Sequence, residues 1–281
     1  MRRIAVATDF SERGSVAVER AVAIAEATGA ELFFLHAIGD DRSRPVAVTV
    51  EQAHEQLLTA REAYGNRILS AQDVVVGAID RALLNAVEQA GADLLVVGDH
   101  QRTAVLDLFR DTTMERLARR SQVPLLVARI SPTRPYQRAM LGLEGDEADD
   151  LVRAVDLLGP AAPGHLTGFH AYNAATRYLA FARVPEAEID AYRASIVNGA
   201  RTWILAALDP AFHERLHLRL EEGDPEIALL KAAAEDRSEL TVVSTHARRR
   251  LSRVVLGSVS AELIRRGTTD LLVVPRERRA S

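Results

Sequence analysis

The feature that most constrains the fold of this 281-residue chain is an internal repeat. Residues 93–127 align without a gap with residues 239–273 when His100 is placed opposite His246. Upstream, residues 4–11 align with 139–146. Such self-similarity in the same order means that one supersecondary unit is used twice. The sequence therefore predicts two domains of similar fold, 1–132 and 137–281.

Short apolar runs alternate with helix-length amphipathic segments. The runs in the first half are rich in Val, Ile and Leu without polar alternation, as is typical of buried parallel strands; they are 4–8, 32–36, 73–76, 94–97 and 125–128. Helices are expected between them, for example at 16–27 and 81–89. This alternation indicates βαβ units with helices on both faces. We expect an α/β fold in which each half is a doubly wound, five-stranded parallel sheet.

The two halves differ in length at one place. The repeat offset grows from about 135 to about 146 residues, which predicts an insertion in the second half between its second and third strands. The segment 172–213 is this longer region, and it reads as helical. The joint between the halves is expected at 130–138, where two prolines disfavour both a helix and a central strand.

Composition narrows the class of protein. The net charge is −4, which gives no electrostatic argument for nucleic-acid binding, and the absence of cysteine excludes disulfides and thiolate chemistry. No apolar run approaches the roughly 20 residues that span a bilayer, and the chain starts directly with a strand pattern rather than a signal peptide. We expect a cytoplasmic protein that binds neither membranes nor nucleic acid.

In an open α/β sheet, ligands bind outside the carboxyl ends of the strands. In the second half these ends carry Glu144, His170 and Ser244, and in the first half they carry Asp9, His36 and Gly98. Around them, residues 97–112 and 243–260 resemble the universal stress protein family. Its nucleotide-binding members carry Gly, two residues, Gly, nine residues, then Gly-Ser or Gly-Thr, and its tandem members place two such domains in one chain.

The first half departs from this motif in a way that obstructs a phosphate. Its motif positions are Gly98, Gln101, Asp111 and Thr112. A side chain at Gln101 blocks the close approach of backbone amides, and the carboxylate of Asp111 repels an anion. Residues 112–115 also fit a capping box, so we expect Thr112 to cap a helix over 113–119 while Asp111 complements its positive end.

The second half keeps more of the phosphate-binding part. Its motif positions are Ser244, Ala247, Gly257 and Ser258, where the residues are small and no acid follows before Glu262. The resemblance implies that ATP or a related nucleotide, with Mg²⁺ if it binds, would lie in this half. The candidate binding residues are Gly142, Leu143, Glu144, Ala171, Val243, Ser244, His246, Ala247, Gly257, Ser258, Val259 and Ser260.

The nucleoside end shows the opposite asymmetry. The family's nucleotide-binding members carry an Asp after the first strand, which Asp9 matches, whereas the second half has Glu144, one methylene longer. Ala37 and Ala171 would lie beside the base, although simple strand-end packing explains them equally well. Each half has therefore lost part of a complete site.

Two further patterns have competing interpretations. His36, His170, His100 and His246 occupy repeat-equivalent places, which permits a zinc site, but histidines hydrogen-bonded by backbone are the favoured interpretation. The arginines at 248–250, with Arg253, either close over phosphates or are simply solvated.

The sequence favours a stress-response binding and regulatory protein, because it contains no Walker A motif, nucleophile elbow, HExxH or GxGxxG. Two alternatives stay open: a structural stress protein that binds no nucleotide, and a slow ATPase using Glu144 or His246. The resemblance also implies an internal pseudo-dimer in which 125–128 pairs with 271–274, and a homodimer through another face.

Overall fold

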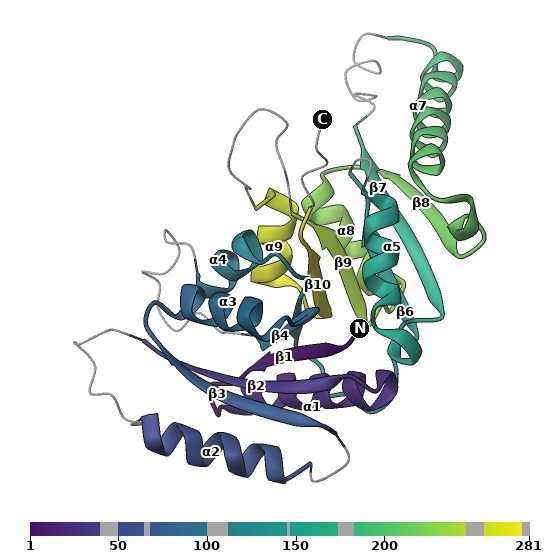
Figure 1. Ribbon diagram of the computed structural model, residues 1–281. Helices are drawn as coiled ribbons and strands as arrows, with labels where there is room; N and C mark the ends of the chain where they lie inside the picture. Colours follow the sequence, from purple (N-terminus) through teal and green to yellow (C-terminus); the bar gives the residue numbers. More distant parts are fainter. Residues whose placement is uncertain are drawn as a thin grey trace.

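Ten strands form one continuous sheet in the part of the chain that the computed structural model describes, residues 1–39, 50–64, 68–99, 112–144, 147–173, 183–245 and 256–276 (Figure 1). The strands are β1 (Arg3–Ala7), β2 (Glu31–Ile38), β3 (Ser70–Val76), β4 (Leu94–Gly98), β5 (Leu125–Ala128), β6 (Arg138–Gly142), β7 (His165–Tyr172), β8 (Leu216–Glu222), β9 (Leu240–Ser244) and β10 (Asp270–Val274). The helices are α1 (Glu12–Thr28), α2 (Val50–Glu62), α3 (Ile79–Ala90), α4 (Thr113–Arg120), α5 (Ala148–Asp156), α7 (Glu186–Ala207), α8 (Pro225–Glu235) and α9 (Ser258–Arg266), with short 3₁₀ turns η3 (Gly159–Ala161) and η4 (Pro210–Phe212).

The sheet order is β3-β2-β1-β4-β5-β10-β9-β6-β7-β8, so the first half (β1–β5) and the second half (β6–β10) repeat the same arrangement. Neighbours within each half are parallel. The halves join where β5 pairs antiparallel with β10, with Leu126 opposite Leu272. Both the doubly wound parallel halves and the internal pseudo-dimer are confirmed. The pairing covers two sheet edges that would otherwise be open.

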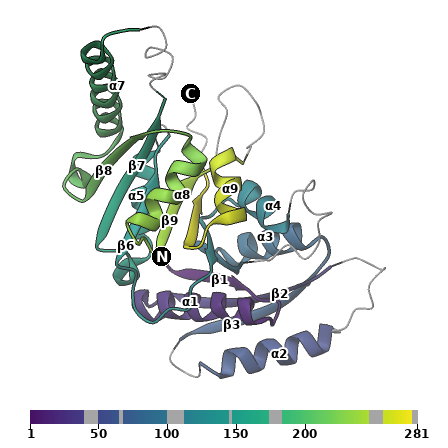
Figure 2. The ribbon, with the colours of Figure 1, turned by 180° about the vertical axis from the view of Figure 1, so that it is seen from behind.

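Helices cover both faces of the sheet, as the two opposite views show (Figures 1 and 2). Helices α1, α2, α5 and α7 contribute to the core on one face, and α3, α4, α8 and α9 contribute to the core on the other. Each core contains residues of both halves, because the sheet continues across the β5–β10 junction. Because β6 pairs in parallel with both β7 and β9, the carboxyl ends of these three strands lie at one edge of the second-half sheet. Among the described helices, none is long and apolar enough to cross a bilayer.

Local chemistry explains the helix ends. The Thr112 hydroxyl accepts from the Glu115 N–H at 3.1 Å, and the Glu115 carboxylate accepts from the Thr112 N–H at 2.9 Å, which confirms the predicted capping box. Helix α1 begins at Glu12, earlier than the expected residue 16, because Ser11 caps it through the Gly14 N–H. Its C-cap is Gly29, whose left-handed φ of 69° is one that glycine adopts without strain.

One element differs from the expectation, and one predicted feature is present. Strand β3 begins at Ser70 rather than residue 73, and its polar first residues are tolerated because it is an edge strand paired only with β2. The expected longer region of the second half lies between β7 and β8, where α7 has 22 residues against 13 in α2.

Candidate functional site

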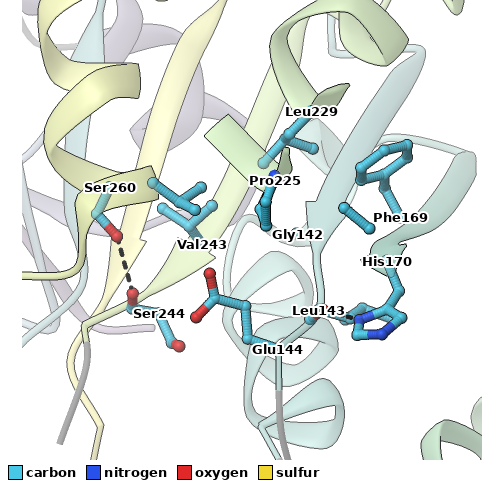
Figure 3. A pocket seen from close by; sticks show the side chains of 12 residues that line it. Gly142, Leu143, Glu144, Phe169, His170, Pro225, Leu229, Val243, Ser244 and Ser260 are labelled. Atoms are coloured by element: carbon cyan, nitrogen blue, oxygen red, sulfur yellow. Dashed lines mark hydrogen bonds between the residues drawn. The ribbon is translucent and has the colours of Figure 1, made fainter. Parts of the chain in front are cut away.

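A cavity of about 270 Å³ lies at the carboxyl ends of β6, β7 and β9 (Figure 3). Helices α8 and α9 complete its wall with their first turns. This is the switch point of the second-half sheet, where β6 lies between β7 and β9. The lining residues are Gly142, Leu143, Glu144, Phe169, His170, Ala171, Pro225, Leu229, Val243, Ser244, Val259 and Ser260.

Most of the candidate residues from the sequence gather on this wall. Those that line it are Gly142, Leu143, Glu144, Ala171, Val243, Ser244, Val259 and Ser260. Gly257 and Ser258 stand at the start of α9 beside the wall but do not line it. His246 and Ala247 lie outside the described residues, as do His100, Gln101, Asp111 and the arginines at 248–253.

The sequence interpretation did not assign Phe169, Pro225 and Leu229 to the site. Pro225 and Leu229 come from α8, which packs over the end of β6. A Cβ on Gly142 would stand 2.8 Å from the Leu229 Cδ2 atom, so the glycine makes room for this helix. A glycine at the end of an otherwise apolar strand was the available signal for such a close approach.

The start of α9 offers free backbone amides. Gly257 is its N-cap residue, no side chain of the described residues caps the helix, and its first turn holds no acid. Ser260 is 2% exposed, and its hydroxyl donates to the Ser244 carbonyl at 3.0 Å, which ties the helix start to the end of β9. Unpaired N–H groups and the positive end of the helix dipole together favour an anion here.

Glu144 places its carboxylate in the cavity, between Ser244 and Leu143 in the view of Figure 3. Its backbone N–H donates to the carboxylate of Glu147, which is 1% exposed and stands just before α5. The buried Glu147 therefore fixes the turn that carries Glu144. A carboxylate held in this way can accept hydrogen bonds from hydroxyl groups of a ligand.

The strand-end histidines contact backbone carbonyls in both halves. His170 Nδ1 lies 2.8 Å from the Leu143 carbonyl oxygen, and His36 Nδ1 lies 2.8 Å from that of Thr8. A carbonyl only accepts, so Nδ1 carries the proton and donates in each case. In the described ranges, no three His, Cys, Asp or Glu side chains are grouped to hold a metal ion.

The equivalent cavity of the first half is smaller, about 160 Å³, and Asp9, Ala37 and Gly98 line it. The side chain of Asp9 is occupied by the N–H and hydroxyl of Ser11. At the far end, the capping box at the start of α4 uses the N–H groups of Thr112 and Glu115. This cavity therefore has less space, and its helix end already carries a side-chain cap.

Charges beside the first cavity pair with one another. Asp99, which follows Gly98, lies 3.4 Å from Arg129 Nε and 3.9 Å from Arg13 Nη1. Burial holds the pKa of Arg129 below its ordinary value, although the Asp99 carboxylate opposes this lowering. Arg129 also donates to the carbonyls of Leu263 and Ile264 in the last turn of α9. Beside the first cavity, the single Asp99 carboxylate thus pairs with two guanidinium groups.

Comparison with known proteins agrees with this architecture. The family model described as "Universal stress protein family" matches residues 1–129 and 135–275. A universal stress protein from Archaeoglobus fulgidus is 17% identical, with a TM-score of 0.65 and 98% of both chains covered. A universal stress protein structure from Pseudomonas aeruginosa is 18% identical, with a TM-score of 0.65, covering 98% of this chain and 93% of its own. Among curated proteins, none is a significant match. With the family model matching in both halves, this chain belongs to the universal stress protein family.

Proposed function

We propose that this protein is a stress-response regulatory protein that binds ATP or a related nucleotide, with Mg²⁺ accompanying it, in the second-half cavity. The observation that carries the proposal is the contrast between two helix starts. At α9 the N-cap is Gly257 and no side chain of the described residues caps the helix, whereas at α4 the side chains of Thr112 and Glu115 form a capping box. A free helix N-terminus beside a strand-end cavity is a suitable place for a phosphate.

The orientation of the ligand follows from the two ends of the cavity. The phosphates would lie against residues 257–260, and the nucleoside would lie toward Glu144 and Ala171. His246 and Ala247, which lie between β9 and α9 in the sequence, belong to the proposed phosphate side. The family membership supports this polarity, and we also propose a cytoplasmic homodimer, which sedimentation velocity would test.

Gly257→Asp tests the phosphate side. Aspartate is a favoured N-cap residue, so the variant should fold at least as well as the parent while placing a carboxylate on the α9 amides. Loss of one charge-assisted contact predicts weaker ATP binding by about 1.5–3 kcal/mol, or roughly 10- to 150-fold. Gly257→Asn is the matched control, because it caps the same amides without charge and should weaken binding less. Binding is measured by equilibrium dialysis with labelled ATP.

The outcomes separate the proposal from its alternatives. Gly257→Asp binding ATP as well as the parent would place the ligand elsewhere. Asp111→Gly should change little, because the second half is the proposed site. A parent that binds no ATP, and releases no nucleotide on denaturing extraction, would instead favour a structural stress protein. Multiple turnover of ATP would identify a slow ATPase.

A further inference from the structure

One aromatic side chain of the inserted helix in the second half contacts a residue that lines the second cavity. Trp203, in the longer helix α7, contacts His170 edge to face, with ring centroids 5.8 Å apart and planes at 65°. His170 lines the cavity and is held by the Leu143 carbonyl. The residue after Leu143 is Glu144, whose carboxylate stands in the cavity. Trp203 is therefore connected to Glu144 through the ring of His170 and its hydrogen bond to Leu143, the residue before Glu144.

In the first half, the equivalent histidine contacts a different aromatic residue. There the ring of Phe10 stacks on His36, with centroids 4.5 Å apart and planes at 26°. Phe10 lies in the turn directly after β1, with a φ of 60°. The repeat alignment places Gly145 opposite Phe10, and a glycine supplies no ring. Among the described residues, each strand-end histidine thus contacts one aromatic ring, and in the second half the inserted helix provides it.

We propose that Trp203 is a positioning residue for the nucleoside end of the second cavity. The inference rests on the proposed function. Trp203 holds the His170 ring so that its Nδ1–H keeps the Leu143 carbonyl in place, and this fixes the strand end from which Glu144 extends. The phosphate end of the cavity is formed by α9, and the contact between Trp203 and His170 does not involve that helix. Loss of Trp203 should therefore weaken the binding of the sugar and base selectively.

The surroundings of Trp203 suit this role. Its neighbour Ile204 is 0% exposed and belongs to the core on one face of the sheet, whereas Trp203 itself is 40% exposed. Removing the indole therefore leaves the main packing contact of the helix intact. Tyr192, about three turns earlier on α7, is another exposed aromatic side chain and offers a matched control.

The experiment compares the parent with Trp203→Ala, Trp203→Phe and Tyr192→Ala, using ATP, adenosine and inorganic tripolyphosphate in isothermal titration. Loss of an edge-to-face contact predicts about two- to tenfold weaker binding of ATP and adenosine to Trp203→Ala. Tripolyphosphate binding should be unchanged. Trp203→Phe should keep most of the ATP affinity of the parent, and Tyr192→Ala should bind ATP as tightly as the parent. Since Trp203 is the single tryptophan of the chain, ATP should also change the intrinsic fluorescence of the parent.

The opposite results are equally clear. Parent-like binding of ATP by Trp203→Ala, with no fluorescence change in the parent, overturns the role of Trp203 while the proposed function stands. Equal weakening of ATP and tripolyphosphate shows a general loss of structure and overturns the positioning role. A parent that binds no ATP overturns the proposed function and this inference with it.

Discussion

Arg20 in α1 and Asp270 at the start of β10 form a buried ion pair that joins the two halves. Arg20 Nε lies 2.9 Å from Asp270 Oδ2, and the two side chains are 5% and 0% exposed. Asp270 Oδ1 accepts the backbone N–H groups of Arg129 at 2.7 Å and Ile130 at 3.0 Å. The Tyr136 hydroxyl donates to Asp270 Oδ2 at 2.5 Å. One carboxylate of the second half therefore holds a helix of the first half and both ends of the linker.

Removing one partner of this pair should be costly. Asp270→Ala leaves the Arg20 charge buried and unpaired, and we expect the free energy of unfolding to fall by about 3–5 kcal/mol. Urea denaturation followed by circular dichroism measures the change. Asp156→Asn is the control, because the Asp156–Arg215 pair is largely solvent-exposed and should contribute little. A loss for Asp270→Ala no larger than for this control would contradict the buried-pair interpretation.

Tyr136 should make stability depend on alkaline pH. Burial raises the pKa of Tyr136 well above its ordinary value of 10.0, and the Asp270 charge raises it further. Above pH 10.0 the unfolded chain loses the proton of the Tyr136 hydroxyl, whereas the folded protein keeps it up to its higher pKa. The stabilising contribution is therefore complete below pH 10.0 and is lost as the pH rises above that value.

Tyr136→Phe isolates this contribution. The variant should lose about 1–3 kcal/mol at neutral pH, because Asp270 loses a hydrogen bond. Above about pH 10 its free energy of unfolding should fall less steeply than that of the parent, by up to about 1.4 kcal/mol per pH unit. Urea unfolding between about pH 8 and pH 11 tests this. Parallel curves for the two proteins would refute the assignment.

Gly98 should be needed for packing at the first cavity. A Cβ at this position would lie 2.4 Å from the Arg13 carbonyl oxygen, which belongs to the backbone of α1 and cannot move cheaply. We expect Gly98→Ala to destabilise the protein by about 1–3 kcal/mol. At Gly164 a Cβ would meet nothing within 4 Å, so Gly164→Ala is the control. Equal melting temperatures for the two variants would show that α1 does not approach β4 this closely.

Cutting the linker should leave the halves together. Residues 131–135 are mostly exposed, whereas the β5–β10 pairing and the Arg20–Asp270 pair lie in the interior. A protease site introduced at 131–135 should yield, after cleavage, two fragments that coelute in gel filtration with unchanged circular dichroism. High salt should not separate them, since buried contacts are screened little. Separate elution or loss of helical signal would argue against an independently folded, associated pair.

The sequence alone determined the features that depend on neighbours along the chain. The repeat and the Val/Ile/Leu runs predict the ten strands, and Thr112 with Glu115 predicts the helix start, because periodicity and caps act over a few residues. The pairing of β5 with β10 came from the family resemblance. For the candidate site, the strand-end residues such as Glu144 and Ser244 were predicted, since the ends of parallel strands meet at one edge.

Only the tertiary structure decided which distant residues join them. Leu229 enters the cavity because α8 crosses the end of β6, and Trp203 reaches His170 because α7 lies against the strand ends. Likewise, Asp270 meets Arg20 only when β10 pairs with β5. No local pattern specifies these contacts, because they depend on the angles and offsets at which helices pack on a sheet. Differences of a few ångströms there determine whether a side chain lines the cavity, supports it or faces solvent.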